Sequence, residues 1–148
     1  MYSFVLFSHS ILRWAVLLLA IYLVGRSAAG WIRSEERSDS EGRLGTIYAG
    51  IVDLQFLLGL ILYLGLSPIM KAVFSDFGAA MQNDELRFFA VEHLPFMIIG
   101  TAFAHIGSRV DKRDTDAKNK WRSSTIWFGL SLATFLAGIP WFRPFLPF

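Results

Sequence analysis

Four long apolar runs divide the chain, and charged or polar segments separate them. The runs cover approximately residues 3–25, 45–66, 86–109 and 123–141 of the 148 residues. A helix needs about 20 consecutive apolar residues to cross the hydrocarbon core of a bilayer. The pattern therefore predicts an all-α fold. We expect a four-helix transmembrane bundle of up-down-up-down topology, which forms a single membrane domain over residues 1–148.

A shorter amphipathic stretch lies between the second and third runs. Ile69, Val73, Phe77 and Ala80 fall on one face if this stretch is helical. The spacing is typical of a short interfacial amphipathic helix that lies on the membrane surface. It fits equally well a short helix that folds over the mouth of the bundle.

Polar residues mark where the helices should begin. Ser67 precedes Pro68, Asn83 precedes the third run, and Ser123 or Ser124 precedes the fourth. Such side chains accept hydrogen bonds from N–H groups of the first helical turn, and proline is favoured at the first helical position. We therefore expect these residues to cap their helices.

Composition and charge indicate a membrane protein and its orientation. Hydrophobic residues make up 54% of the chain, and the mean hydropathy is +0.46. The segments that follow the first and third runs hold ten of the cations, whereas the opposite side holds only Lys71, Arg87 and Arg143. The positive-inside rule then predicts a multi-pass protein of the bacterial inner membrane with both termini on the periplasmic side. The basic residues are mixed with acids, so we expect the lipid bilayer and no nucleic acid as a partner.

Two histidines at one depth are the leading candidates for a cofactor site. His9 lies early in the first run and His93 early in the third, and these two helices run in the same direction. Gly100 shares the face of His93 and leaves room beside it. Four-helix bundles hold haem between facing helices, and neutral imidazole is a good axial ligand for its iron. The pattern predicts haem b between the two helices, with His9 and His93 as axial ligands.

Two arginines lie near these histidines. Arg13 is one turn from His9 on the same face, and Arg87 lies at the start of the third run. A haem propionate would partner each of them, although Glu92 would also serve Arg13. An alternative without cofactor is a buried polar network of His9, Arg13 and Glu92 that fixes helix packing, with His93 hydrogen-bonded to a neighbour.

The third histidine lies near the other membrane surface. His105 is about 18 Å further along the axis than His93, so it is too far away to bind the same iron. Asp53 in the second run is its expected neighbour, together with Tyr48. These residues form a candidate quinone or proton site. A simple buried hydrogen bond between His105 and Asp53 is the alternative.

Small residues repeat at helical spacing on two runs and predict close helix packing. These ridges are Gly100, Ala104 and Gly107 on the third run, and Gly129, Ala133 and Ala137 on the fourth.

Five short motifs resemble a known family. They are SHSILRW at 8–14, LLGLILYL at 57–64, LRFFAVEH at 86–93, AHIGSR at 104–109 and GIPW at 138–141. The chain resembles small four-span bacterial membrane proteins labelled cytochrome b-like, whose functions are poorly defined. The resemblance implies a helical bundle in an energy-transducing membrane and a b-type haem, with His9, His93 and His105 as the positions concerned.

The function expected from the sequence is electron transfer rather than independent enzyme activity. We expect a haem-binding or quinone-contacting electron carrier, or a subunit of a respiratory or photosynthetic complex with other membrane subunits as partners. The alternative is a cofactor-free accessory subunit that stabilises a larger membrane complex. A third hypothesis is a small transporter that uses Arg13, Asp53 and Glu92. The lack of a visible inverted repeat argues against it.

Overall fold

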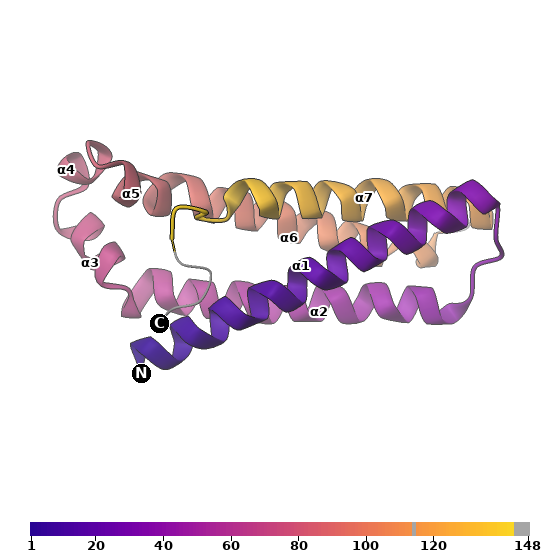
Figure 1. The fold of residues 1–148 in the computed structure, drawn as a ribbon, viewed down its shortest axis with the longest axis horizontal. Coiled ribbons are helices and arrows are strands. Elements are labelled where there is room, and N and C mark those ends of the chain that lie inside the picture. The colour runs from indigo at the N-terminus through magenta and orange to yellow at the C-terminus, as the bar shows by residue number, and fades with distance from the viewer. Residues whose placement is uncertain (114, 144–148) are drawn as a thin grey trace.

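The computed structural model describes residues 1–113 and 115–143, and every element in this part of the chain is helical. Four long helical segments lie along one another (Figure 1). They are α1 (Tyr2–Arg33), α2 (Asp39–Ile61) with the π-helical η1 (Leu62–Leu66), the third segment, and α7 (Ala117–Gly138). The third segment consists of α5 (Asp84–Arg87), the π-helical η2 (Phe88–His93) and α6 (Leu94–Ser108). The predicted all-α fold is confirmed.

Three helical segments are long and apolar enough to cross a membrane. They cover Tyr2–Arg33, Asp39–Leu66 and Asp84–Lys112. The last of these includes η3 (Val110–Lys112), a 3₁₀ turn after α6. The fourth predicted span corresponds to α7, which is not among the three, so a four-span bundle stays a prediction. The chain is accordingly a membrane protein with at least three candidate spans.

The four long segments pack as a closed ring of neighbours. α6 packs on α7 and α2, and α1 packs on α7 and α2. Their shared core contains Tyr48 and Val52 of α2 together with Phe128 and Phe135 of α7. Each helix therefore buries one stripe, while the opposite stripe carries exposed apolar side chains such as Leu18, which suits a lipid environment.

The small-residue ridge of α6 does pack a helix, as predicted. A Cβ on Gly100 would lie 2.5 Å from the ring of Phe135, and a Cβ on Gly107 would lie 2.7 Å from Phe128. The matching prediction for α7 is wrong. Gly129 has open space beside it, and Ala133 and Ala137 are exposed. α7 instead turns its large aromatic residues inward, because the glycines of α6 make room for them.

Two of the predicted caps are confirmed and one is wrong. Ser67 accepts from the N–H of Met70, and Asn83 accepts from the N–H of Leu86. The cap of α7 is Asp116, which accepts from the N–H of Asn119 at 2.7 Å. Ser123 and Ser124 lie inside that helix, which begins earlier because Trp121 and Ser124 are buried against its neighbours.

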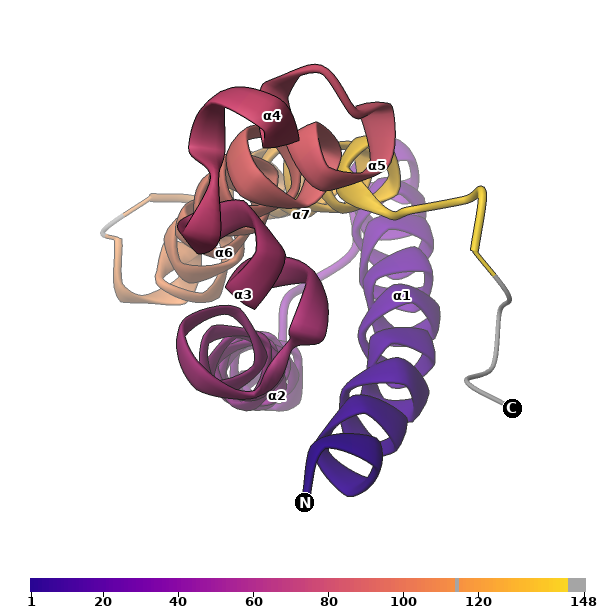
Figure 2. The ribbon, with the colours of Figure 1, turned by 90° about the vertical axis from the view of Figure 1, so that its left-hand side faces the viewer.

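The amphipathic stretch forms two short helices instead of one. These are α3 (Pro68–Ser75) and α4 (Phe77–Met81), and Asp76 separates them by capping α4 through the N–H of Ala79. Met70, Val73 and Ala80 form a small core with Ala90 of η2. The two helices thus pack across one end of the bundle, and Figure 2 shows this end towards the viewer.

At the opposite end, the charged segments are docked onto the bundle. The guanidinium carbons of Arg26 and Arg37 lie 4.5 and 4.3 Å from the ring centroid of Trp121. The indole N–H of Trp121 donates to the carbonyl of Glu35 at 2.9 Å. Gly30 also packs on this indole, where a Cβ would lie 2.5 Å from it. These contacts explain why α1 continues to Arg33, well beyond the apolar run.

Candidate functional site

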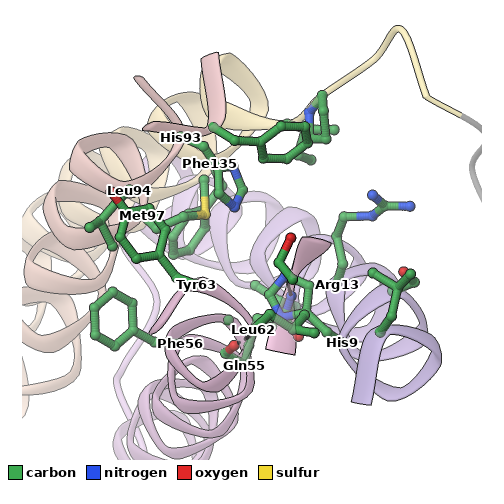
Figure 3. Close-up of a pocket in the computed structure, with 18 of the residues that line it drawn as sticks. His9, Arg13, Gln55, Phe56, Leu62, Tyr63, His93, Leu94, Met97 and Phe135 are labelled. Carbon is green, nitrogen blue, oxygen red and sulfur yellow. Dashed lines mark hydrogen bonds between the residues drawn. The ribbon is translucent and has the colours of Figure 1, made fainter. Parts of the chain in front are cut away.

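A cavity of about 410 Å³ opens at the end of the bundle where the chain begins. It is bounded by α1, α2, the third segment and α7, and apolar side chains make up most of its wall. His9, Arg13, Gln55 and His93 are among its polar residues, together with others such as Tyr63, Thr101 and Arg143. In Figure 3, His93 and His9 enter from opposite walls. The two histidines that the sequence predicted at one depth are therefore brought to one cavity.

The imidazole of His93 is oriented by a backbone carbonyl. Its Nδ1 lies 2.7 Å from the oxygen of Gly138, in the last turn of α7. A carbonyl only accepts hydrogen bonds, so Nδ1 carries the proton and, in the neutral ring, Nε2 keeps a lone pair. Within the described residues, this Nε2 has no hydrogen-bond partner. A histidine held through one N–H with the other nitrogen free has the arrangement of a metal ligand with an outer hydrogen bond.

His9 differs because Gln55 engages both of its ring nitrogens. Its Nδ1 donates to the backbone oxygen of Gln55 at 3.2 Å, and its Nε2 lies 3.3 Å from the side-chain Nε2 of Gln55. The ring also lies against Gly59, where a Cβ would be 3.0 Å from the imidazole Cε1. The absence of a side chain at Gly59 thus lets α1 and α2 approach at this level. The Nε2 of His9 becomes available to a ligand only when the Gln55 amide turns away.

Two further polar atoms of the cavity residues are buried without a hydrogen-bond partner in the described part of the chain. They are the Oε1 of Gln55 and the Oγ1 of Thr101. Burying a polar atom without a hydrogen bond costs about 1–3 kcal/mol. Both atoms are closed off from the cavity space, so a bound polar group would reach them only after a side-chain shift.

A π-helical turn sets the position of His93. η2 ends at His93, two residues before Pro95. In a π-helix the carbonyl of Ala90 would receive the N–H of residue 95, which proline lacks. The hydroxyl of Tyr63 donates to that carbonyl instead, at 2.8 Å. Such single π-turns often occur at functional sites.

Two of the residues predicted for the cofactor lie elsewhere. Arg87 pairs with Asp84 at 3.0 Å and with Glu92 at 3.4 Å, and it does not line the cavity. Glu92 thus faces Arg87 and not Arg13. The space beside Gly100 is filled by the Phe135 ring, so it offers no room to a ligand. Of the predicted set, His9, Arg13 and His93 line the cavity, whereas Arg87 and Gly100 do not.

The second predicted site is brought together only in part. The Nε2 of His105 lies 2.7 Å from the Oδ1 of Asp53, so the expected pair forms. The pair is not buried, because the side chains of His105 and Asp53 are 34% and 52% exposed. Tyr48 is not part of it. Its hydroxyl donates to Ser131, which in turn donates to the carbonyl of Gly100 in the helix core.

Some groups that shape the site, among them Gln55, Tyr63 and the carbonyl of Gly138, were not assigned from the sequence. Gln55 and Tyr63 are polar residues within the second apolar run. A polar residue in a predicted membrane span is uncommon, and this would have been the sequence signal for both of them. The carbonyl of Gly138 left no such signal. A backbone acceptor becomes available there only because α7 ends at that residue.

Comparisons with other proteins give no further guidance on this site. No protein-family model, curated protein or solved structure matches the chain. In the described residues, no three His, Asp or Glu side chains gather as a bare metal ion would require. Haem iron needs only one or two protein ligands, since the macrocycle supplies the other four.

Proposed function

We propose that the chain is a membrane electron-transfer protein, or an electron-transferring subunit of a respiratory or photosynthetic complex, and that its cavity holds haem b. The observation that carries the proposal is the ring of His93, whose Nδ1–H is held by Gly138 while Nε2 is free at the cavity. The haem, when bound, supplies one-electron transfer. The protein would act as a carrier and not as an independent enzyme.

The residues of the cavity differ in how readily they could hold a haem. His93 is ready to ligate, because its tautomer and orientation are already set by the Gly138 carbonyl. Arg13 lines the same cavity and offers a cation for a carboxylate such as a propionate. The apolar wall, which includes Leu62, Met97 and Phe135, excludes water from a macrocycle and lowers the local dielectric.

His9 needs a local rearrangement before it can ligate. Gln55 must release the imidazole Nε2, while the bond from Nδ1 to the Gln55 carbonyl can remain and hold the ring. The same movement of the Gln55 side chain would take its Oε1, which is buried without a hydrogen-bond partner among the described residues, out of the buried position. We therefore propose that His93 would hold the haem iron as the structure stands, and that His9 would join it once Gln55 has moved.

The test is a reduced-minus-oxidised absorption spectrum of the protein purified in mild detergent. We expect a b-type α-band in the wild type and loss of the low-spin band in both His93→Ala and His9→Ala. His105→Ala is the matched control, since its side chain pairs with Asp53 on the outer surface, and it should keep the full band.

Each alternative outcome has a defined meaning. Folded wild-type protein without any b-type band would overturn the haem proposal and favour a cofactor-free accessory subunit. A band that persists in both His9→Ala and His93→Ala would show that the ligands lie elsewhere.

The proposed location is the bacterial inner membrane, with four spans and both termini on the periplasmic side. Ten cations lie around the α1–α2 and α6–α7 connections, at one end of the bundle, and support this orientation. They belong to the end of the bundle opposite to the proposed haem cavity, so the cavity would lie in the outer half of the membrane.

A further inference from the structure

A second cavity, of about 340 Å³, lies at the charged end of the bundle. It is formed by the connection after α1, the first turns of α2, η3 and the start of α7. Four cations line it, namely Arg37, Arg43, Lys112 and Lys120. Two acids, Asp39 and Asp111, line it as well, so the described wall keeps an excess of positive charge. This excess indicates an anionic ligand.

Arg37 gives the cavity a buried donor that is not used. Its side chain is only 5% exposed, and its Nε and Nη2 donate to the two carboxylate oxygens of Asp111 at 2.5 and 2.9 Å. Its Nη1 is buried without a hydrogen-bond partner in the described part of the chain. The stack on Trp121 does not replace that partner, because the N–H bonds of a guanidinium lie in its plane and the indole covers its face.

The N-terminus of α2 adds partial positive charge at the same place. Ser38 is its N-cap residue, and the Ser38 side chain makes no capping hydrogen bond to the backbone. Ser38, Asp39 and Gly42 all line the cavity. The helix dipole favours negative charge there, and Asp39 and Glu41 of the first turn already meet part of it. α7 contributes less to this effect, since Asp116 already caps it.

We propose that this cavity is a binding site for a phosphate group. The tetrahedral oxygens of a phosphate would accept from Lys112 and Lys120, which line the cavity, and the buried guanidinium of Arg37 lies beside them. The carboxylate of Asp111 is already paired with Arg37, so it repels the ligand less than a free acid would. Phosphates of this kind come from an anionic phospholipid headgroup or from free phosphate. Basic pockets between helices at a membrane surface suit the former.

The experiment measures ligand-dependent stabilisation of the full chain in dodecyl maltoside. Thermal unfolding is followed while either dioleoylphosphatidylglycerol or inorganic phosphate is titrated, and the rise in Tm yields a Kd. The test variant is Lys112→Gln/Lys120→Gln, which removes two cations of the cavity and leaves Arg37 in place. The control variant is Arg113→Gln/Lys118→Gln, which removes the same charge from neighbouring residues that do not line the cavity.

We expect saturable stabilisation of the wild type by at least one of the two probes. The Kd should rise about fivefold for each cation removed in the cavity variant, and the control should keep the wild-type Kd. Stabilisation by phosphatidylglycerol alone identifies the lipid headgroup as the source, and stabilisation by both identifies the phosphate group itself as sufficient. Equal weakening in the two variants, or no saturable effect of either probe, would overturn the proposal.

Discussion

At the residue scale, the two histidines of the cavity are distinguished by their hydrogen-bond partners. His93 donates to a carbonyl that can only accept, so its second nitrogen stays free. His9 meets the backbone oxygen of Gln55 with one nitrogen and the Gln55 amide with the other. The two side chains are identical in chemistry, and only their surroundings make one a ready ligand and the other an occupied one.

The glycines of the small-residue ridges are likewise distinguished by what lies beside them. Gly100 and Gly129 both belong to small-residue ridges in the sequence. Only Gly100 faces a neighbour, because the Phe135 ring occupies the space where its Cβ would be, whereas Gly129 has nothing within 4 Å.

We therefore predict that Gly100→Ala destabilises the protein and that Gly129→Ala does not. The added Cβ at Gly100 would meet Phe135 at 2.5 Å and force the rings or helices apart. Overpacking of this kind costs about 1–3 kcal/mol. Replacing a helical glycine that has open space beside it by alanine stabilises by roughly 0.5–1 kcal/mol. Thermal unfolding of the purified variants measures both effects, and equal Tm values for the two variants would contradict this packing.

At the element scale, the third segment combines a π-helical turn with a proline. η2 widens the helix over Phe88–His93, and Pro95 removes the N–H that a π-turn needs to close on Ala90. Tyr63 supplies the missing donor from η1 of the second segment. The geometry that carries His93 thus depends on a side chain from another helix.

We expect Tyr63→Phe to destabilise the fold by about 1–3 kcal/mol, because the carbonyl of Ala90 is then left without a donor. The same substitution should cost much less in a Pro95→Ala background, where residue 95 regains its N–H and can donate to Ala90. Denaturant unfolding of the wild type, both single variants and the double variant measures this coupling. Tyr22→Phe serves as the control, since Tyr22 is exposed on α1. A cost for Tyr63→Phe that is independent of residue 95 would argue against the role of the proline.

At the scale of the whole molecule, the two ends of the bundle have different chemistry. One end holds the histidine cavity, to whose wall α3 contributes Ile69 and Met70. The other end holds the charged segments, where Arg37 and Asp111 tie the connection after α1 to η3. If the bundle spans a membrane four times, these ends face opposite compartments.

Cysteine labelling tests that topology directly, because the chain has no cysteine of its own. We predict that Glu36→Cys and Thr115→Cys are protected from a membrane-impermeant maleimide in intact cells. Gln82→Cys and Phe142→Cys should react, since these residues lie at the opposite end of the long helices from Glu36 and Thr115. Labelling after the membrane is permeabilised confirms that the first two cysteines are reactive. If Thr115→Cys and Phe142→Cys label from the same side, α7 does not cross the membrane.

The sequence alone determined the number of long helices, much of their extent and the caps at Ser67 and Asn83. These features depend on local patterns, namely runs of apolar residues, proline positions and side chains that reach the nearest N–H groups. The sequence also predicted that His9 and His93 lie at the same depth in the bundle. Depth follows from the position of a residue along its helix when the two helices run in the same direction.

Only the tertiary structure decided which faces meet. It turned the Gly129 ridge outward, filled the space at Gly100 with Phe135, paired Arg87 with Glu92 and extended α1 to Arg33. Helix rotation and side-chain partners depend on the fit between helices that are far apart in sequence. A single helix with apolar residues on nearly all sides, as a membrane requires, carries little information about which side faces its neighbours. The free nitrogen of His93 is such a case, because it depends on where α7 ends beside η2.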